Sequence, residues 1–314
     1  MFRVLKNLRD IGVLAINSRN ADYILPHNPR RFYPLVDDKV RTKQLAEAHG
    51  IPCPELYGVI EVEGQVHEID SIIGGRSEFV IKPAHGTGGE GILVISGRPN
   101  DMFRKADGLI LTHDEVNHHL FNLLSGLYSL GGQPDRVLIE YRVKFDPLFE
   151  KISYLGVPDI RIITFLGVPV ISMVRLPTRM SDGKANLHQG AVGAGIDLSS
   201  GKTLAGVWND RIVHEHPDTG HSISGLRIPE WDRLLETAAR CCEITGLGYQ
   251  GVDIVLDKDK GPLLLEINAR PGLNVQIANN TGLLPRLHMV EQRHSELENT
   301  AERVAFAKEH FKAA

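Results

Sequence analysis

Residues 79–96, FVIKPAHGTGGEGILVIS, pass from an apolar segment through Lys82 into four glycines and then into a second apolar segment. The residues after the glycines are rich in β-branched side chains, which favours a strand. Glycine lets a backbone approach a ligand closely and offer its N–H groups to phosphate oxygens. The pattern predicts two strands joined by a glycine-rich loop, which is either a phosphate-binding lid or a flexible surface turn. As a lid, it would place the Lys82 ammonium group beside phosphate oxygens.

Two other kinds of phosphate loop do not fit this stretch. Gly86, Gly88 and Gly91 have the spacing G-x-G-x-x-G, but the dinucleotide fingerprint requires a helix to begin at the glycines. A P-loop requires Lys and then Ser or Thr, where this chain has Ile92 and Leu93. A hairpin is the remaining interpretation.

Polar side chains also occur in GVDIVLD (251–257) and LLLEIN (263–268), which read as two strands. Glu266 and Asn268 are two residues apart on a strand, so they project from the same face. If the strands pair antiparallel through a two-residue turn at 259–260, Asp253 lies opposite Glu266 on that face.

This face has two interpretations, a magnesium site and a solvated sheet surface. Two carboxylates and an amide oxygen are hard ligands suited to Mg²⁺ that also contacts substrate phosphates. Val255 is two residues from Asp253, and Leu264 is two residues from Glu266, so the same alternation places both apolar side chains on this face. Apolar side chains there disfavour a solvated surface. The candidate metal ligands are therefore Asp253, Glu266 and Asn268.

Other segments indicate a mixture of helices and hairpins. DDKVRTKQLAEAHG predicts a helix capped by Asp37 and stopped at Gly50, after an extended segment at 25–34. A hairpin is expected to turn near 167–169. A helix is expected over 229–245, with buried side chains at Trp231, Leu234, Leu235, Ala238 and Cys242. This order predicts an α+β fold rather than regular βαβ alternation.

Composition limits the classes of function. The chain has 314 residues, 42% hydrophobic residues and a net charge of −4, which argues against a protein that coats nucleic acid. Its three cysteines lack the spacing of a metal or disulfide site. No apolar run reaches membrane-spanning length, so we expect a cytoplasmic protein without membrane insertion.

These motifs, in this order, resemble the ATP-grasp superfamily and, within it, the RimK-type α-L-glutamate ligases. FVIKP with GTGGEGI is similar to the family's phosphate-binding lysine and lid, and LIEYR to its adenine-binding hinge strand. DIR at 159–161, NLHQGA at 186–191, and GVDIVLD with LEINARPG are similar to its later nucleotide and magnesium motifs. The resemblance implies an α+β ATP-grasp fold with two α+β subdomains gripping ATP between them.

The resemblance also implies site residues. Arg161, Arg270 and Lys82 are the expected catalytic cations, which stabilise the phosphoryl group and the tetrahedral oxyanion. The expected nucleotide contacts are Lys39, Lys82, Gly86, Gly88, Gly89, Glu140, Tyr141, Asp159, Lys184 and Asn186. The expected cofactors are ATP and Mg²⁺, with Mn²⁺ as a substitute.

We expect the chain to be divided into four segments. They are a short N-terminal segment (1–36), an ATP-grasp subdomain with a helix and the glycine-rich lid (37–140), an ATP-grasp subdomain with the magnesium site (141–290) and a C-terminal helix (291–314). The first segment is too short for the full N-terminal pre-ATP-grasp domain of RimK-type enzymes. Residues 196–228 resemble an insertion.

The expected activity is an ATP-dependent carboxylate–amine ligase that forms an amide through an acyl phosphate, releasing ADP and phosphate. Its expected partners are small-molecule or peptide carboxylates and amines, with a homo-oligomer or a partner protein as a further source of acceptor contacts. The alternatives are an ATP-grasp phosphotransferase acting on a small molecule and a non-catalytic ATP-binding module.

Overall fold

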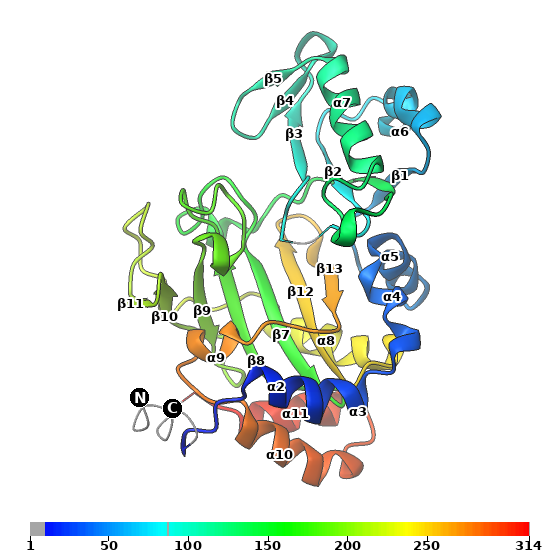
Figure 1. Ribbon diagram of the computed structural model, residues 1–314. Coiled ribbons are helices and arrows are strands. Elements are labelled where there is room, and N and C mark those ends of the chain that lie inside the picture. The colour runs from blue at the N-terminus through cyan, green and yellow to red at the C-terminus, as the bar shows by residue number, and fades with distance from the viewer. Residues whose placement is uncertain (1–9, 87, 314) are drawn as a thin grey trace.

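The computed structural model describes residues 10–86 and 88–313, which form two antiparallel sheets with helices packed on them (Figure 1). The smaller sheet has the strand order β1-β6-β2-β3-β4-β5. Its strands are β1 (Leu56–Ile60), β2 (Phe79–Pro83), β3 (Leu93–Gly97), β4 (Phe103–Lys105), β5 (Ile110–Leu111) and β6 (Val137–Glu140). The larger sheet has the order β11-β10-β9-β8-β7-β12-β13. Its strands are β7 (Asp159–Phe165), β8 (Val168–Leu176), β9 (Val192–Ile196), β10 (Thr203–Trp208), β11 (Arg211–Val213), β12 (Tyr249–Asp257) and β13 (Gly261–Asn268).

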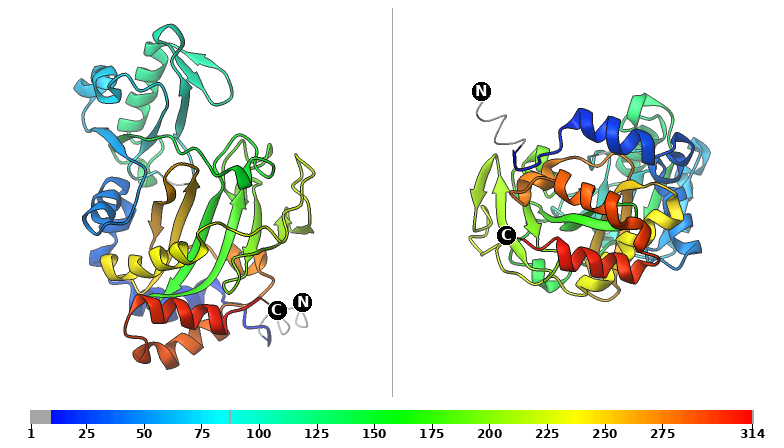
Figure 2. Two further views of the ribbon diagram at one scale, coloured as in Figure 1. Left: turned by 180° about the vertical axis from the view of Figure 1, so that it is seen from behind. Right: turned by 90° about the horizontal axis from the view of Figure 1, so that it is seen from below.

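Helices pack around both sheets. The smaller sheet carries α6 (Ile69–Ile73) and α7 (His113–Leu124), and α5 (Lys39–Ala48) lies beside the junction of the sheets (Figure 1). The larger sheet contacts α8 (Trp231–Thr245), α9 (Asn274–Ala278), α10 (Leu284–Arg293) and α11 (Thr300–His310), and Figure 2 shows α10 and α11 side by side. Two α+β subdomains, as expected from the sequence, are thus present.

The predicted glycine-loop hairpin is confirmed. β2 and β3 pair antiparallel, with Phe79 opposite Ile95, and both side chains are fully buried. Behind them, α7 begins with a capping box in which Thr112 and Glu115 hydrogen-bond each other's backbone N–H groups. The hairpin therefore rests on a fixed helix, and the glycines project from its end.

The larger sheet holds the main core. The predicted helix over 229–245 is confirmed as α8, which ends at Gly246 with φ of 69°. Its buried stripe contains Trp231, Leu234 and Ala238 as expected. Cys242 was predicted on that stripe, but Cys241 is the fully buried cysteine and Cys242 is only partly buried.

Residues 25–34 were predicted to be extended, and that prediction is wrong. They lie in a run of short helices: α2 (Ile16–Ser18), a π-helical turn (Arg19–Ile24), α3 (Leu25–His27), a 3₁₀ turn (Arg30–Phe32) and α4 (Pro34–Asp37). The prolines lie at helix starts, where a missing N–H has no cost. Asn28 joins this run to the larger sheet through hydrogen bonds with the backbone of Tyr249 and Ala269.

The cap of α5 was placed one residue early in the sequence. Asp38 is the N-cap, and its carboxylate accepts hydrogen bonds from the N–H groups of Val40 and Arg41. Asp37 instead ends α4. The shift matters because Lys39 becomes the first residue of α5, directly beside the glycine loop.

The pairing of Asp253 with Glu266 is confirmed, but the expected turn is wrong. Asp257 pairs with Gly261, so three residues form the turn, and a bulge after Asp253 restores the register. The bulge also reverses one predicted side chain, because Leu264 packs into the main core rather than beside Val255.

Both ends of the described chain pack on the larger sheet, since Leu14, Tyr23, Val304 and Phe311 belong to its core. The division into four segments given above, with its three boundaries, stays a prediction. Among the described residues, no helix is long and apolar enough to cross a membrane.

Candidate functional site

A buried carboxylate lies between two buried lysines below the glycine loop. Glu140, at the end of β6, is 3% exposed, and its Oε1 is 2.5 Å from the Nζ of Lys82 on β2. Its Oε2 is 3.0 Å from the Nζ of Lys43 on α5. Burial alone would raise the pKa of Glu140, but Lys82 and Lys43 outweigh burial and hold that pKa below its usual value. Glu140 is therefore ionised at neutral pH.

A third lysine stands at the base of the glycine loop. Lys39 donates through Nζ to the carbonyl oxygen of Gly86 at 2.5 Å. Burial lowers the pKa of Lys39, and the carboxylate of Glu266 opposes that shift. Lys39 lies on α5 and Glu266 on β13, and these two elements contact each other, so one of the lysines lies near one of the predicted metal ligands.

The glycines are required by close approaches and by backbone conformation. A Cβ on Gly86 would lie 2.2 Å from the ring of Pro83, so no larger residue fits there. Gly88 and Gly89 have φ of 66° and 80°, which favours glycine.

The loop between the glycines and β3 contacts the larger subdomain. Glu90 Oε1 accepts from Lys184 Nζ at 2.9 Å and from Gln189 Nε2 at 3.0 Å. A Cβ on Gly88 would lie 3.5 Å from Nδ2 of Asn186. Lys184 and Asn186, predicted as nucleotide contacts, therefore lie against the glycine loop, and Lys184 pairs with Glu90.

Asp253 is fully buried at the centre of an ion-pair network on the larger sheet. Arg161 on β7 donates to its two oxygens at 2.7 and 2.5 Å, and Arg175 on β8 donates at 2.8 Å. Arg175 also pairs with both oxygens of Asp159. The hairpin pairing of β7 and β8 brings Asp159 and Arg175 opposite each other.

The pKa values of Asp253 and Asp159 are shifted in opposite directions. Burial would raise the pKa of Asp253, but Arg161 and Arg175 outweigh it and hold the pKa well below its usual value. Burial raises the pKa of Asp159 to about 6, because Arg175 offsets burial only in part and Asp253 adds a like charge.

The predicted metal ligands lie together. Asn268 Nδ2 is 3.2 Å from Asp253 Oδ2 and 3.3 Å from Glu266 Oε1, and the Glu266 side chain is 35% exposed. In the described part of the chain, no group of three or more His, Cys, Asp or Glu side chains is arranged to hold a metal ion. Two carboxylates and an amide nevertheless fit Mg²⁺, which is usually held by one or two carboxylates together with substrate phosphates.

Two predicted residues have partners elsewhere. Arg270 has a 54% exposed side chain that lies 3.6 Å from a carboxylate oxygen of Asp37 and over the ring of Tyr33. Tyr141 donates its backbone N–H to the carbonyl of Glu55 at 2.8 Å. The catalytic role of Arg270 and the adenine contacts of Glu140 and Tyr141 stay predictions.

Sequence reasoning did not assign Lys43, Arg175 or Glu90 to the site. Lys43 is four residues after Lys39, a spacing that places both on one side of a helix, and this signal was available. Arg175 lies on the strand that follows the predicted hairpin turn, and no local pattern indicates that it pairs with Asp159. Glu90 gave no signal, because its partners are distant in the sequence.

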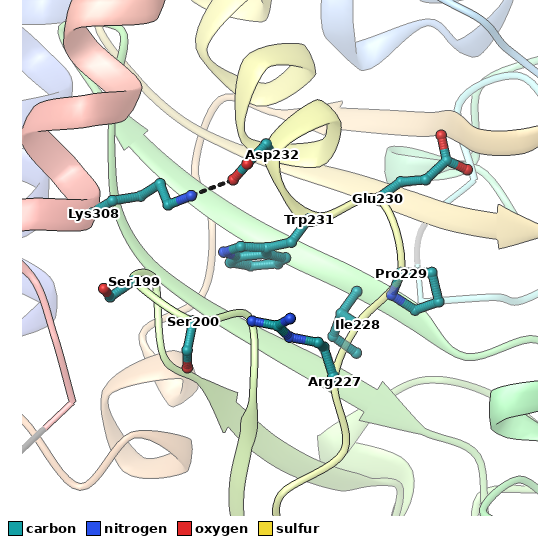
Figure 3. Close-up of a pocket in the computed structure, with 9 residues that line it drawn as sticks. All are labelled: Ser199, Ser200, Arg227, Ile228, Pro229, Glu230, Trp231, Asp232 and Lys308. Carbon is teal, nitrogen blue, oxygen red and sulfur yellow. Dashed lines mark hydrogen bonds and ion pairs between the residues drawn. The ribbon is translucent and has the colours of Figure 1, made fainter.

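His216 is buried and hydrogen-bonds the carbonyl of Pro177. A separate cavity of about 410 Å³ opens beside the start of α8 (Figure 3). Trp231 lines it and donates its indole N–H to the carbonyl of Leu198, and Lys308 pairs there with Asp232 at 2.5 Å. None of the predicted site residues lines it.

Comparison with known proteins gives a family and several relatives. The family described as sugar-transfer associated ATP-grasp matches residues 18–292. A probable alpha-L-glutamate ligase of Maridesulfovibrio salexigens is 26% identical over 236 residues, covering 75% of this chain and 56% of the relative. One of Aeromonas salmonicida is 25% identical, covering 75% and 57%. The chain thus spans a little over half the length of these relatives.

Solved structures give weaker likenesses. D-cycloserine synthetase DcsG is 17% identical, with a TM-score of 0.47 over 84% of this chain and 72% of that one. The ATP-grasp ligase PsnB, solved with a precursor variant, Mg and ADP, is 12% identical, with a TM-score of 0.48 over 86% and 61%. D-alanine–D-alanine ligase from Bacillus anthracis is 16% identical, with a TM-score of 0.46 over 88% and 70%.

Proposed function

We infer the function from one premise: the chain belongs to the sugar-transfer associated ATP-grasp family. We propose that it is an ATP- and Mg²⁺-dependent ligase that joins a carboxylate to an amine. The names of the curated relatives make glutamate the first acid to test.

The excess of positive charge around Glu140 is the observation that best supports a nucleotide site. Lys82 and Lys43 share the single carboxylate of Glu140, so this buried group has a net charge of +1. Lys39 adds an ammonium group whose hydrogen bond is to a neutral carbonyl. Excess buried positive charge beneath a glycine loop favours a polyphosphate, because an anion there recovers electrostatic free energy at low dielectric constant.

The other side of the site supplies the chemistry of transfer. Mg²⁺, held by Asp253, Glu266 and Asn268, would neutralise charge on the phosphate oxygens, and Mn²⁺ would substitute. Lys82 and the glycine-loop N–H groups hold the phosphates. Arg161, which is hydrogen-bonded to Asp253, stabilises the transferring phosphoryl group. Arg270 serves as a second cation.

The reaction proceeds in two steps. A carboxylate oxygen of the acid attacks the γ-phosphorus of ATP, which forms an acyl phosphate and releases ADP. The amine then attacks the acyl carbon, loses a proton, and displaces inorganic phosphate. No side-chain nucleophile is required, so the residues serve to position the substrates and stabilise charge.

The test is to incubate the full chain with Mg-ATP, glutamate and a panel of amines, and to analyse the products by mass spectrometry. The proposal expects equal amounts of ADP and phosphate, together with a product whose mass equals acid plus amine minus water. A stable phosphorylated product without free phosphate would instead establish the phosphotransferase. The variant Glu266→Ala should abolish product formation.

A further inference from the structure

Lys43 is a buried lysine on the side of α5 that faces the smaller sheet. It is 5% exposed, and its Nζ lies 3.0 Å from Glu140 and donates to the carbonyl of Pro54. Lys39, one helical turn earlier, reaches the glycine loop instead. The two lysines therefore have different surroundings, since Lys39 contacts the lid and Lys43 contacts the carboxylate beneath it.

The carboxylate of Glu140 competes with phosphate for Lys82. An ion pair between Lys82 and a buried glutamate is strong at low dielectric constant, and breaking it leaves an unpaired buried charge. When Lys82 turns towards a phosphate, Glu140 needs another cation to stay ionised without a large free-energy cost. Lys43 already occupies the second oxygen of that carboxylate.

We propose that Lys43 is a positioning residue for the nucleotide: it neutralises Glu140 so that Lys82 is available to the phosphates of ATP. This inference rests on the proposed function, since it names a residue that supports that same nucleotide site. Lys43 acts through Glu140 and Lys82.

A double-mutant cycle tests this role. The variants are Lys43→Gln, Glu140→Gln and the two combined, each titrated by calorimetry with Mg²⁺ and a non-hydrolysable ATP analogue. Glutamine at 43 keeps an N–H donor for the Pro54 carbonyl and removes the charge. We expect Lys43→Gln to weaken binding by about tenfold or more when Glu140 is intact, and by less than about threefold in the Glu140→Gln background.

The contrary results are distinct. An equal loss in both backgrounds, or no loss in either, overturns the role of Lys43 while binding by the wild type still supports the nucleotide site. A wild type that binds no nucleotide overturns both. If Lys43→Gln alone fails to fold, recovery of cooperative thermal unfolding in the combined variant supports the charge relationship, and lack of recovery overturns it.

Discussion

Arg161 and Asp253 lie directly opposite each other on β7 and β12 and are joined by two hydrogen bonds of 2.7 and 2.5 Å. The two hydrogen bonds hold the buried carboxylate of Asp253 in place where the proposed metal and phosphates would meet. A lysine at 161 keeps the charge but cannot make both bonds.

The first prediction follows from this pair. Arg161→Lys should lower kcat for ADP formation by about 100-fold, because the lysine cation is no longer held in place by two hydrogen bonds to Asp253 and so is not preorganised at the transferring group. Steady-state kinetics measure the effect. The matched control is Arg233→Lys, because Arg233 on α8 forms an exposed ion pair with Glu230. This variant should have the same kcat as the wild type. A kcat within about threefold of the wild type would remove Arg161 from the reaction.

The second prediction concerns the contact between the lid and the larger subdomain. Glu90→Ala removes the bonds to Lys184 and Gln189, which are exposed and therefore weak, of about 0.2–1 kcal/mol. We expect the Kd for Mg-ATP to rise about two- to fivefold, with a smaller effect at high salt. Asp107→Ala, which removes a similar exposed pair with Lys105, should leave the Kd unchanged. Equal effects of both variants would contradict a lid contact.

The third prediction concerns stability. Asn28 donates to the carbonyls of Tyr249 and Ala269 at 2.6 and 2.9 Å and accepts from the N–H of Tyr249 at 2.9 Å. Asn28→Ala leaves these buried groups unpaired and should lower the free energy of unfolding by about 3 kcal/mol. Urea unfolding measures the change, with the exposed Gln133→Ala as control. A loss below about 0.5 kcal/mol would show that the N-terminal helices are not anchored through Asn28.

The fourth prediction is a pH dependence. The pKa of Asp159 is raised from 3.8 to about 6 by burial, so between these pH values the folded protein keeps a proton that the unfolded chain has released. The free energy of unfolding that Asp159 contributes is therefore present at low pH and lost as the pH rises through about 6.

Asp159→Asn removes this titration. The Tm of the wild type minus that of Asp159→Asn should fall from pH 4 to pH 7 and then stay level. Asp253, whose pKa is depressed, has the opposite effect and acts only below its usual range. A Tm difference that is constant or rises across pH 4–7 would contradict the raised pKa.

The sequence predicted the parts of the fold that depend on local patterns. The spacing of apolar residues, together with glycines at the ends of segments, predicted the β2–β3 hairpin and α8. The two-residue alternation of side chains along a strand placed Asp253 opposite Glu266. The register came out right although the turn was wrong, because the longer turn and the bulge compensate each other. The run of short helices before α5 was missed because prolines indicate breaks without showing what lies between them.

The rest of the site depends on contacts between distant segments. The pairing of Asp159 with Arg175 requires a bulge between Ile163 and Thr164 that no local pattern indicates. Lys43 carried a helical spacing signal, but only the packing of α5 against β6 brings it to Glu140. Glu90 reaches Lys184 only because the two subdomains face each other.

The measurement that tests the central claim most directly is hydroxamate formation from Mg-ATP, glutamate and other candidate acids in hydroxylamine. Hydroxylamine converts an acyl phosphate into a hydroxamate, so the amine substrate need not be known. We predict hydroxamate with one acid, in step with ADP release, and none with Glu266→Ala. Release of ADP without hydroxamate from any acid, or hydroxamate at the wild-type rate from Glu266→Ala, would contradict the account.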